Sequence, residues 1–482
     1  MMAPALRRDL TRGLVLGVGM GLASLAASRP QMLWLALQLL LAALAWWVLT
    51  DASRWVLAFL AAVILLPPLP LPWGDAGPHP AILLAALGLL AGAARLSAWQ
   101  IRLDFVSAAL SFFFFALLFS VPLGALYSGW EVGLGSLARV GLFAISLYLF
   151  FYLAHGPGRD LQPERLIRLL FRAAVVSAAF ACLDFYFQFP APARFAEQFV
   201  WLPSGVLRRA QGVFYEATAL GSFCVFFLVM IVSAVALRLW GRLRVGAGWA
   251  VAGALVFLAA LIFSFSRSAI ASLLVALAAL GWLERERLRT KVRLARWSLA
   301  ALALLLGGAA VVTRLWPDFL STYLLRLRYT GEFLMSAPAL ILGPRLETWR
   351  FLFSYIAEHP WQTFFGVGYK TLPYSRFLGR PVVADNMYLS ILVETGWLGL
   401  AALLIFNGAV LITSYRWATR ADSDLRRLFG VWIFCFWCGQ TVQMLSGDIL
   451  TYWRLLPLYF SVLALSLRDS RREYEHPVAG SI

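Results

Sequence analysis

Long apolar runs recur along almost the whole chain, and they constrain its fold more strongly than any single motif. Lipid offers no hydrogen-bond partners to an open backbone, and a helix of about 20 residues crosses the ~30 Å hydrocarbon core of a bilayer. The runs therefore predict an all-α integral membrane protein, a bundle of about 12–14 transmembrane helices. The lower figure allows for prolines in the third run and for Arg267, which interrupts the run from 249 to 283. The runs lie near 13–28, 32–50, 55–72, 80–94, 105–127, 132–154, 169–189, 217–237, 249–265, 268–283, 298–315, 388–412, 428–446 and 449–467.

The composition excludes a soluble globular protein. Of the 482 residues, 61% are hydrophobic and 13% are charged, whereas about 25% charged residues is usual for soluble domains. The mean hydropathy is +0.78. Neither a soluble domain nor a sequence repeat interrupts the runs, so we expect residues 1–482 to form a single polytopic membrane domain.

The formal net charge of +17 follows the loops rather than one surface patch. If the first run crosses outward as a retained helix, the inward loops hold most of the arginines, which is the positive-inside pattern. This predicts a multi-pass protein with both termini in the cytoplasm. Because the charge has this topological explanation, we expect no nucleic-acid partner. The inward basic residues are Arg7, Arg8, Arg12, Arg159, Arg165, Arg168, Arg238, Arg242, Arg244, those of 284–296, Arg416, Arg420, Arg426, Arg427, Arg468, Arg471 and Arg472.

The four cysteines all lie inside apolar runs: Cys182, Cys224, Cys435 and Cys438. Cys435 and Cys438 form a CxxC pair, but no second pair and no nearby histidine accompanies them. We interpret all four as small apolar helix residues. The sequence therefore predicts neither a disulfide framework nor a metal site.

Two outer segments are too long to be simple turns, and function is expected there. They are 190–216 and the large outer loop region 316–387, in which 345–358 has the apolar spacing of an amphipathic helix at the interface. Both carry arginines on the side where the positive-inside rule predicts few. These arginines either contact lipid headgroups or bind an anionic substrate. They are Arg194, Arg208, Arg209, Arg326, Arg328, Arg345, Arg350, Arg376 and Arg380.

Arg267 lies between two apolar runs, where an unpaired guanidinium costs a few kcal/mol. Either its side chain snorkels to the outer interface, or an anion approaches it between the small serines that surround it. Arg208 and Arg209 stand in a similar position, just before a helix expected to start near Glu216. These arginines are therefore candidates for binding an anion at the outer surface.

Asp385 and Asn386 directly precede the apolar run 388–412. A carboxylate here either stabilises the start of its helix or acts on a substrate, and the arginines on the same side favour the second interpretation. His359 follows the predicted amphipathic helix, a position that is typical of a helix end.

Four stretches, in order and spacing, resemble the O-antigen ligase and O-antigen polymerase family of bacterial envelope glycan enzymes. The resemblance extends over residues 200–410. The stretches are RAQGVFYEA at 209–217, SFSRSA at 264–269, GPRLETWRFLFSYIAEHPWQTFFGVGYKT at 343–371 and ADNMYLSILVETGWLGL at 384–400.

The resemblance implies an all-helical bundle in the bacterial inner membrane, with a large periplasmic loop before the last spans. It implies an enzyme that transfers a glycan from undecaprenyl diphosphate on the periplasmic side, without metal, cofactor or nucleotide sugar. The implied partners are the undecaprenyl-diphosphate-linked glycan, membrane lipids and other envelope polysaccharide assembly proteins.

The resemblance also implies roles for individual residues. Arg209 and Arg267 match arginines that hold the carrier diphosphate, and Asp385 stands where ligases carry a histidine proposed as the base. We predict Asp385, Arg267 and Arg209 as catalytic residues. The predicted substrate-binding residues are Arg208, Glu216, Arg345, Asn386, Tyr388 and His359.

The choice between polymerase and ligase depends on the motif at 385–389. Ligases read His-Asn-x-Tyr/Phe-Leu, whereas this chain reads Asp-Asn-Met-Tyr-Leu, and polymerase-like members more often carry Asp there. We predict a metal-independent, inverting polymerase of lipid-linked repeat units. The alternatives are a ligase that transfers the glycan to a lipid A–core acceptor, and a transporter of the lipid-linked glycan, for which internal repeats are typical.

Overall fold

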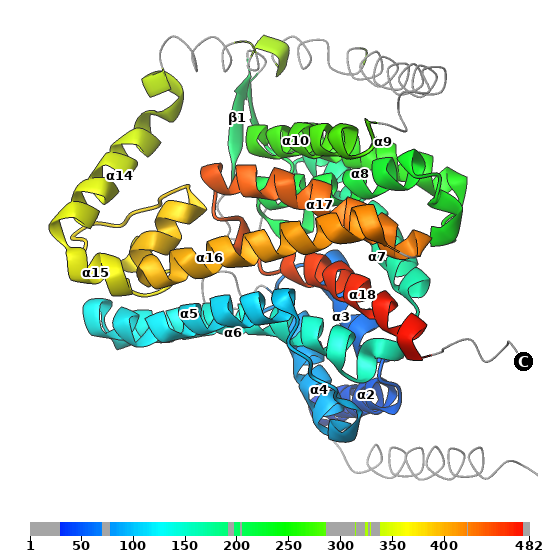
Figure 1. The fold of residues 1–482 in the computed structure, drawn as a ribbon. Helices are drawn as coiled ribbons and strands as arrows, with labels where there is room; N and C mark the ends of the chain where they lie inside the picture. The colour runs from blue at the N-terminus through cyan, green and yellow to red at the C-terminus, as the bar shows by residue number, and fades with distance from the viewer. Residues whose placement is uncertain are drawn as a thin grey trace, which may run out of the picture.

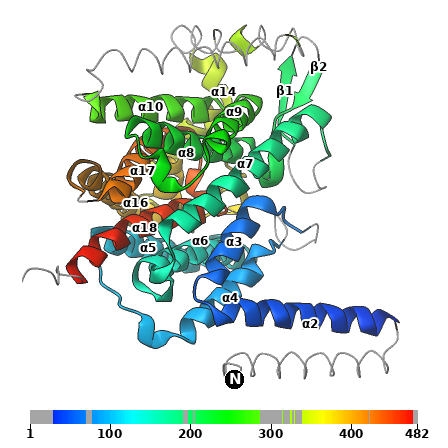
Figure 2. The ribbon, with the colours of Figure 1, turned by 90° about the vertical axis from the view of Figure 1, so that its right-hand side faces the viewer.

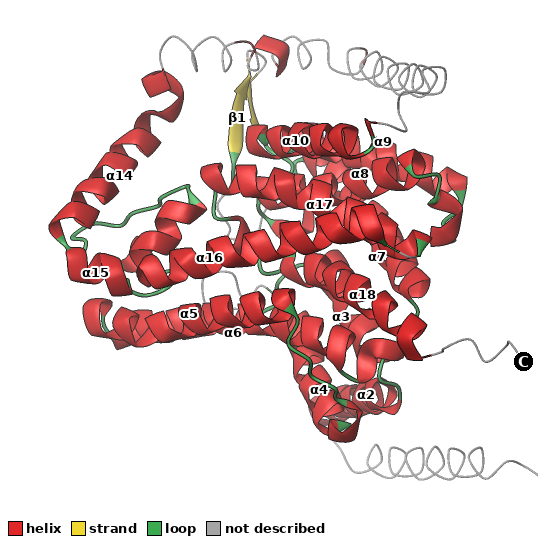
Figure 3. Cartoon of the chain, in the orientation of Figure 1, coloured by secondary structure: helices red, strands yellow, loops and turns green. Residues whose placement is uncertain are grey.

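Nearly every element of the protein is a helix, and one antiparallel hairpin of β1 (Phe199–Leu202) and β2 (Gly205–Arg208) is the exception within the described residues (Figure 3). The sequence analysis did not predict this hairpin. The computed structural model describes residues 29–69, 78–190, 197–202, 205–285, 338–421 and 423–475, with 314, 323–325 and 328.

Twelve apolar helices occur in the described residues, and six of them are long and apolar enough to span a membrane. The long ones are α5 (Phe105–Ser128), α6 (Trp130–His155), α7 (Pro163–Phe187), α8 (Ala217–Ala236), α16 (Met387–Arg420) and α17 (Asp424–Gln443). The elements that contain the shorter ones are α2 (Arg29–Thr50), α3 (Arg54–Leu65), α4 (Ala81–Ala93), α9 (Ala247–Phe263), α10 (Arg267–Leu283) and α18 (Leu456–Glu475).

The predicted all-α integral membrane bundle is confirmed. Twelve of the fourteen predicted runs coincide with these helices, and the other two, 13–28 and 298–315 apart from residue 314, lie outside the described residues. Several boundaries differ from the prediction, and at two of them the helix is shorter than the predicted run. α3 ends at Leu65 before a Pro-Pro pair, because a residue that precedes proline disfavours the helical conformation. α18 begins only at Leu456, because two short 3-10 turns precede it.

Small residues let the central helices approach closely. A Cβ on Gly221 of α8 would lie 2.7 Å from the Cβ of Ala269 in α10. One on Gly439 of α17 would lie 2.4 Å from the backbone oxygen of Ser272 in α10. In a membrane such contacts replace the hydrophobic drive that water supplies elsewhere. They hold α8, α10 and α17 together, and so fix the ends of these helices relative to one another.

The helix α2 extends away from the other helices along the lower part of Figure 2. It packs against α3 and α4. Its residues Trp34, Trp46 and Trp47 are exposed, as expected for side chains that face lipid in a membrane-embedded helix.

Two helices of the large loop region, α14 (Pro338–Glu358) and α15 (Pro360–Phe365), lie beside the start of α16, at the left in Figure 1. We call this the α14 end of the bundle. Leu352 of α14 is buried with Val367 and Val393 in a hydrophobic cluster separate from the main core. This packing fixes α14 against the segment that leads into α16.

A kink at Gly396 bends α16. Its φ of 71° and ψ of −172° are readily adopted by glycine alone. A Cβ there would lie 2.1 Å from the carbonyl oxygen of Phe364, and a Cβ on Gly366 would lie 2.3 Å from that of Glu394. The backbone after α15 therefore packs directly against the kink, which sets the direction of the first turns of α16.

We expect Gly396→Ala to lower the free energy of unfolding by about 1–3 kcal/mol from the backbone conformation alone, with a further loss from the contact with Phe364. Thermal unfolding in detergent measures the change. Gly408→Ala is the matched control, because the same helix has open space there and alanine favours a helix by up to about 1 kcal/mol. Equal melting temperatures for the two variants would contradict a structural role for the kink.

Candidate active site

Two candidate arginines follow the hairpin. Arg208 ends β2, and the backbone N–H of Arg209 donates to the carbonyl oxygen of Gln198 (2.7 Å). Because successive side chains of a strand point to opposite faces, Arg208 and Arg209 reach different surroundings. The backbone N–H of Ala210 then donates to the carbonyl oxygen of Phe263 (2.9 Å), which brings this segment to the end of α9.

Arg209 borders the turn between α9 and α10. Its Nε donates to the carbonyl oxygen of Ser264 (2.7 Å). In the same turn Phe265 has a φ of 49°, and Ser266 is the N-cap of α10. Arg267 is the first residue of α10 and is exposed. Two arginines that are far apart in the sequence therefore border one turn.

A third arginine comes from α14. The Nε of Arg345 donates to Oδ2 of Asp385 (3.0 Å), and one turn later Nε1 of Trp349 donates to the carbonyl oxygen of the residue before Asp385 (2.7 Å). Arg345 is also close enough to Arg267 for their positive charges to repel each other. Arg209, Arg267, Arg345 and Asp385 thus border one region of the α14 end, which we call the arginine cluster.

Asp385 does not cap its helix. The N-cap of α16 is Asn386, whose side-chain oxygen accepts from the backbone N–H of Leu389 (3.1 Å). The alternative that Asp385 is the capping carboxylate is therefore wrong. Asp385 itself has a φ of 47°, a left-handed conformation that costs a non-glycine residue about 1 kcal/mol or more and is often found at functional sites. Its carboxylate, which is half exposed, faces Arg345 instead.

A second carboxylate, that of Glu216, acts on the same tyrosine as Asp385. Glu216 caps α8 by accepting from a backbone N–H of the first turn (3.2 Å), and it also accepts from Nε2 of Gln198 (2.7 Å). Burial, followed by the negative charges of Glu216, Asp448 and Asp385, raises the pKa of Tyr452. The carboxylate of Glu216, at the start of α8, and that of Asp385, just before α16, therefore both act on the phenol of Tyr452.

Arg208 has a different environment from Arg209. Its guanidinium forms an ion pair with Asp184 of α7, and both side chains are buried. The second carboxylate oxygen of Asp184 accepts from the backbone N–H of Gly212 (3.1 Å). This pair attaches the hairpin to α7, and the contacts of Arg208 are those of a structural residue.

We expect Arg208→Ala to destabilise the protein by about 3–5 kcal/mol, because it leaves a buried carboxylate without its partner. Arg242→Ala is the matched control, since the Arg242–Asp424 pair (3.3 Å) is exposed and such pairs contribute about 0–1 kcal/mol. Folded yield and melting temperature in detergent measure both. A stable Arg208→Ala protein with impaired substrate binding would instead assign Arg208 to the site.

Tyr388 and His359, which were predicted to bind substrate, contact other parts of the protein. The hydroxyl of Tyr388 donates to the carbonyl oxygen of Thr441 (3.0 Å) and joins α16 to α17. His359 stacks on Tyr355 with 4.6 Å between ring centroids and also contacts Phe377 (5.6 Å) at the junction of α14 and α15. These contacts are those of residues that shape the α14 end.

Sequence reasoning missed a pair close to the start of α16. Nζ of Lys370 lies 2.6 Å from Oδ2 of Asp448, and the hydroxyl of Ser390 donates to the same oxygen (3.3 Å). Although burial lowers it, the charge of Asp448 raises the pKa of Lys370 overall. The available signal was a lysine in a loop of glycine and aromatic residues and an aspartate just after an apolar run.

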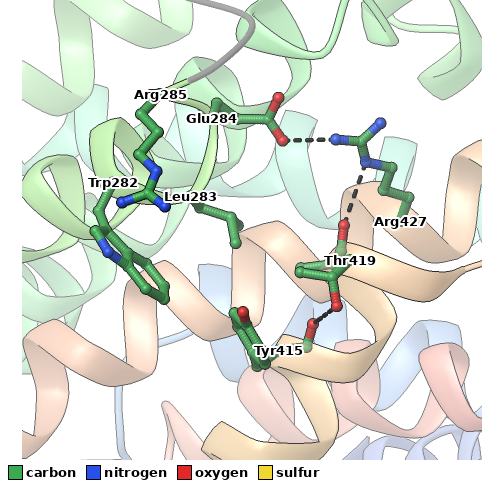
Figure 4. Close-up of a pocket in the computed structure, with 8 residues that line it drawn as sticks. Trp282, Leu283, Glu284, Arg285, Tyr415, Thr419 and Arg427 are labelled. Carbon is green, nitrogen blue, oxygen red and sulfur yellow. Dashed lines mark hydrogen bonds and ion pairs between the residues drawn. The ribbon is translucent and has the colours of Figure 1, made fainter.

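A cavity lies at the end of the bundle opposite the α14 end. It has a volume of about 350 Å³ and lies between the ends of α10 and α16 (Figure 4). Arg427 forms an ion pair with Glu284 (2.7 Å) and donates to the carbonyl oxygen of Ala418 (3.3 Å). Because α10 is 17 residues long, a helical rise of ~1.5 Å per residue separates this cavity from Arg267 by about 25 Å. None of the predicted site residues lines it.

Metal ligands do not cluster in the part of the chain that the structure describes: no group of three or more His, Cys, Asp or Glu is placed to hold an ion there. The four cysteines, Cys182, Cys224, Cys435 and Cys438, are free thiols.

Comparison with known families identifies the central part of the chain. Residues 252–404 match the family model described as O-antigen ligase. This region is similar to the O-antigen ligase family. No curated protein matches the chain. The O-antigen ligase region contains Arg267, Arg345, His359 and Asp385, whereas Arg209 lies before it and joins these residues only in the folded chain.

The similarity to the O-antigen ligase family indicates the general chemistry of the site. The chain is a multi-pass membrane protein, and the matched family implies an enzyme of the ligase or polymerase type that acts on lipid-linked glycans in a membrane. An arginine cluster beside a carboxylate suits such a substrate, because its phosphates are anionic and its acceptor presents a hydroxyl.

Proposed function

We propose that the protein polymerises oligosaccharide repeat units carried on undecaprenyl diphosphate. The observation that carries the proposal is the arginine cluster, in which Arg209 and Arg267 border the turn before α10 and Arg345 pairs with Asp385. Undecaprenyl-diphosphate-linked glycan is the donor, and a hydroxyl of a second repeat unit is the acceptor.

The arginines bind the diphosphate in this proposal. A guanidinium grips phosphate oxygens bidentately and stays protonated. Preorganised positive charge stabilises the negative charge that develops on the leaving oxygen. α10 and α16 both begin at the cluster, so the positive ends of two helix dipoles add to this potential.

Asp385 receives the acceptor. The acceptor oxygen attacks the anomeric carbon as the bond from that carbon to the diphosphate oxygen breaks. The hydroxyl proton passes to the Asp385 carboxylate, and undecaprenyl diphosphate leaves with its negative charge balanced by the arginines. One direct displacement inverts the anomeric carbon. Because Asp385 also pairs with Arg345 (3.0 Å), its carboxylate is held in place and acts chiefly by orienting the hydroxyl.

The α14 end faces the periplasm of the bacterial inner membrane in this proposal, and both termini are cytoplasmic. The other end of the bundle carries Arg242 in the turn after α8, Arg285 after α10, Arg420 as the last residue of α16 and Arg427 in the first turn of α17. Their position at that end agrees with the positive-inside rule.

A ligase is the second candidate, and the description of the matching family favours it. A ligase uses the same donor site but transfers the glycan to a lipid A–core acceptor. The polymerase is preferred because Asp385 stands where ligases of the resembling family carry histidine.

Purified protein incubated with labelled lipid-linked repeat unit separates the two. Laddered products formed without a second lipid support the polymerase. Product that forms only after a core lipid is added supports the ligase. Absence of any covalent product with either acceptor, from protein that is folded by thermal unfolding, contradicts both and leaves a transporter to be tested by vesicle flux.

A further inference from the structure

A cavity of about 140 Å³ lies at the α14 end, between the start of α8, the loop before α4 and the turn before α18. Glu216 and Thr451 line it. Glu216 accepts from Nε2 of Gln198 (2.7 Å), and the carbonyl oxygen of Gln198 accepts from the backbone N–H of Arg209 (2.7 Å). Thr451 donates to the carbonyl oxygen of Asp448 (2.6 Å), whose carboxylate accepts from Ser390 in the first turn of α16 (3.3 Å). The cavity is therefore connected by hydrogen bonds to Arg209 and to the start of α16, the helix that follows Asp385.

A buried arginine holds one wall of the cavity in place. Arg454 donates to the carbonyl oxygens of Val63 (2.7 Å), Leu66 (2.7 Å) and Val213. The first two are at the end of α3, where helix carbonyls lack partners within the helix. Arg454 also lies over the ring of Phe214, 4.8 Å from its centroid. The hydrogen bonds of the Arg454 guanidinium are therefore all made within the wall, and they hold the end of α3 and Val213 in place.

His79 is a second fixed wall residue. One ring nitrogen contacts the carbonyl oxygen of Leu66 (2.9 Å), and the other accepts from the backbone N–H of Ala81 (3.1 Å). Burial and the charge of Arg454 lower the pKa of His79 to about 4, so the ring is neutral at pH 7. A ligand therefore meets acceptor oxygens and aromatic rings. Each carboxylate oxygen of Glu216 already accepts one hydrogen bond and can accept another. The hydroxyl of Thr451 donates to the carbonyl oxygen of Asp448 (2.6 Å), and its oxygen can still accept.

The lining combines aromatic faces with hydrogen-bonding groups. Phe214, Tyr452 and Trp453 supply rings, while Glu216 and Thr451 supply oxygens. This is the chemistry of a sugar site, because a pyranose has an apolar C–H face and a rim of hydroxyls. A diphosphate is disfavoured by the charge of Glu216, and an acyl chain is disfavoured by the cost of covering polar groups. A cavity of about 150 Å³ is known to accept a six-membered ring.

We propose that this cavity binds one sugar ring of the acceptor and so presents the neighbouring hydroxyl to Asp385. The proposal rests on the proposed function, since it places an acceptor beside a donor site at the arginines. It adds a subsite formed by Glu216, Thr451 and Trp453. All three lie outside the region that matches the family, and Thr451 and Trp453 were not predicted from the sequence.

The first experiment tests sugar binding to the cavity by itself, without glycan transfer. Saturation-transfer NMR on the full chain in detergent uses methyl glycosides of glucose, galactose, mannose, rhamnose and N-acetylglucosamine as probes. Trp453→Ala removes a ring face, and Ala219→Leu fills the cavity, which Ala219 lines. Trp361→Ala is the matched control, an exposed tryptophan on α15. At least one glycoside is expected to bind the parent protein and the control, with about tenfold weaker binding after loss of one stacking contact in Trp453→Ala.

Two results would overturn the acceptor subsite: no glycoside binds the parent protein, or Trp453→Ala and Ala219→Leu bind as well as Trp361→Ala. In the transfer reaction the same two variants should raise KM for the acceptor about tenfold, the same loss of one contact, at unchanged KM for the donor. A raised donor KM alone would also overturn it. If glycosides bind as expected while no variant or parent protein transfers glycan, the proposed function fails and sugar binding survives.

Discussion

Replacing Arg267 or Arg209 with alanine is expected to lower glycan transfer by about 10²–10³-fold, because each removes a preorganised positive group from the developing charge of the leaving diphosphate. The Nε of Arg209 is held by the carbonyl oxygen of Ser264, and Arg267 opens α10. Both side chains therefore meet a ligand from fixed backbone positions. Initial rates with lipid-linked repeat unit, at equal amounts of folded protein, measure the loss.

Lysine at either position is expected to recover only part of the rate, since it cannot form the planar two-point contact. Arg350→Ala is the matched control: Arg350 is an exposed arginine on α14, the helix that carries Arg345, but it lies off the face that carries Arg345 and Trp349. The shared site would be refuted if Arg350→Ala were as damaging as Arg267→Ala. It would equally be refuted by full activity in Arg209→Ala.

Asp385→Asn is expected to keep the fold and lose most of the activity, by about 10²-fold or more, the range typical of general acid–base groups. The amide still accepts a hydrogen bond but takes up no proton. Stability should change little, because the pair with Arg345 is half exposed and such pairs contribute about 0–1 kcal/mol. Transfer rate and melting temperature are measured on the same preparation.

The neighbouring residue supplies the control for Asp385. Asn386→Ala removes the observed cap of α16 and is expected to cost about 1 kcal/mol of stability, so its melting temperature should fall while that of Asp385→Asn does not. Recovery of activity in Asp385→His would mean that the position is a base interchangeable with the ligase histidine. Near-normal turnover in well-folded Asp385→Asn would remove Asp385 from the mechanism, and Glu216 would be the next carboxylate to replace.

Helices were predictable because their signal is local. A run such as 217–237 is apolar over its whole length, and in lipid its backbone can satisfy its own hydrogen bonds only as a helix. Prolines and polar turns then set approximate boundaries. The kink at Gly396 was not predictable, because its conformation is fixed by the backbone of Phe364 and Phe365, which reaches it through a loop.

The sequence by itself determined that this is an all-helical membrane protein, and it identified the arginines and Asp385 as the residues able to handle an anionic, hydroxyl-bearing substrate. Only the tertiary structure decided which of them meet. Arg208 and Arg209 are adjacent, yet strand alternation buries the first against Asp184 and brings the second to Ser264. Asp385 and Asn386 are adjacent too, yet one faces Arg345 and the other caps α16. Residue type sets what a side chain can do, while backbone direction and packing between distant segments set what it touches.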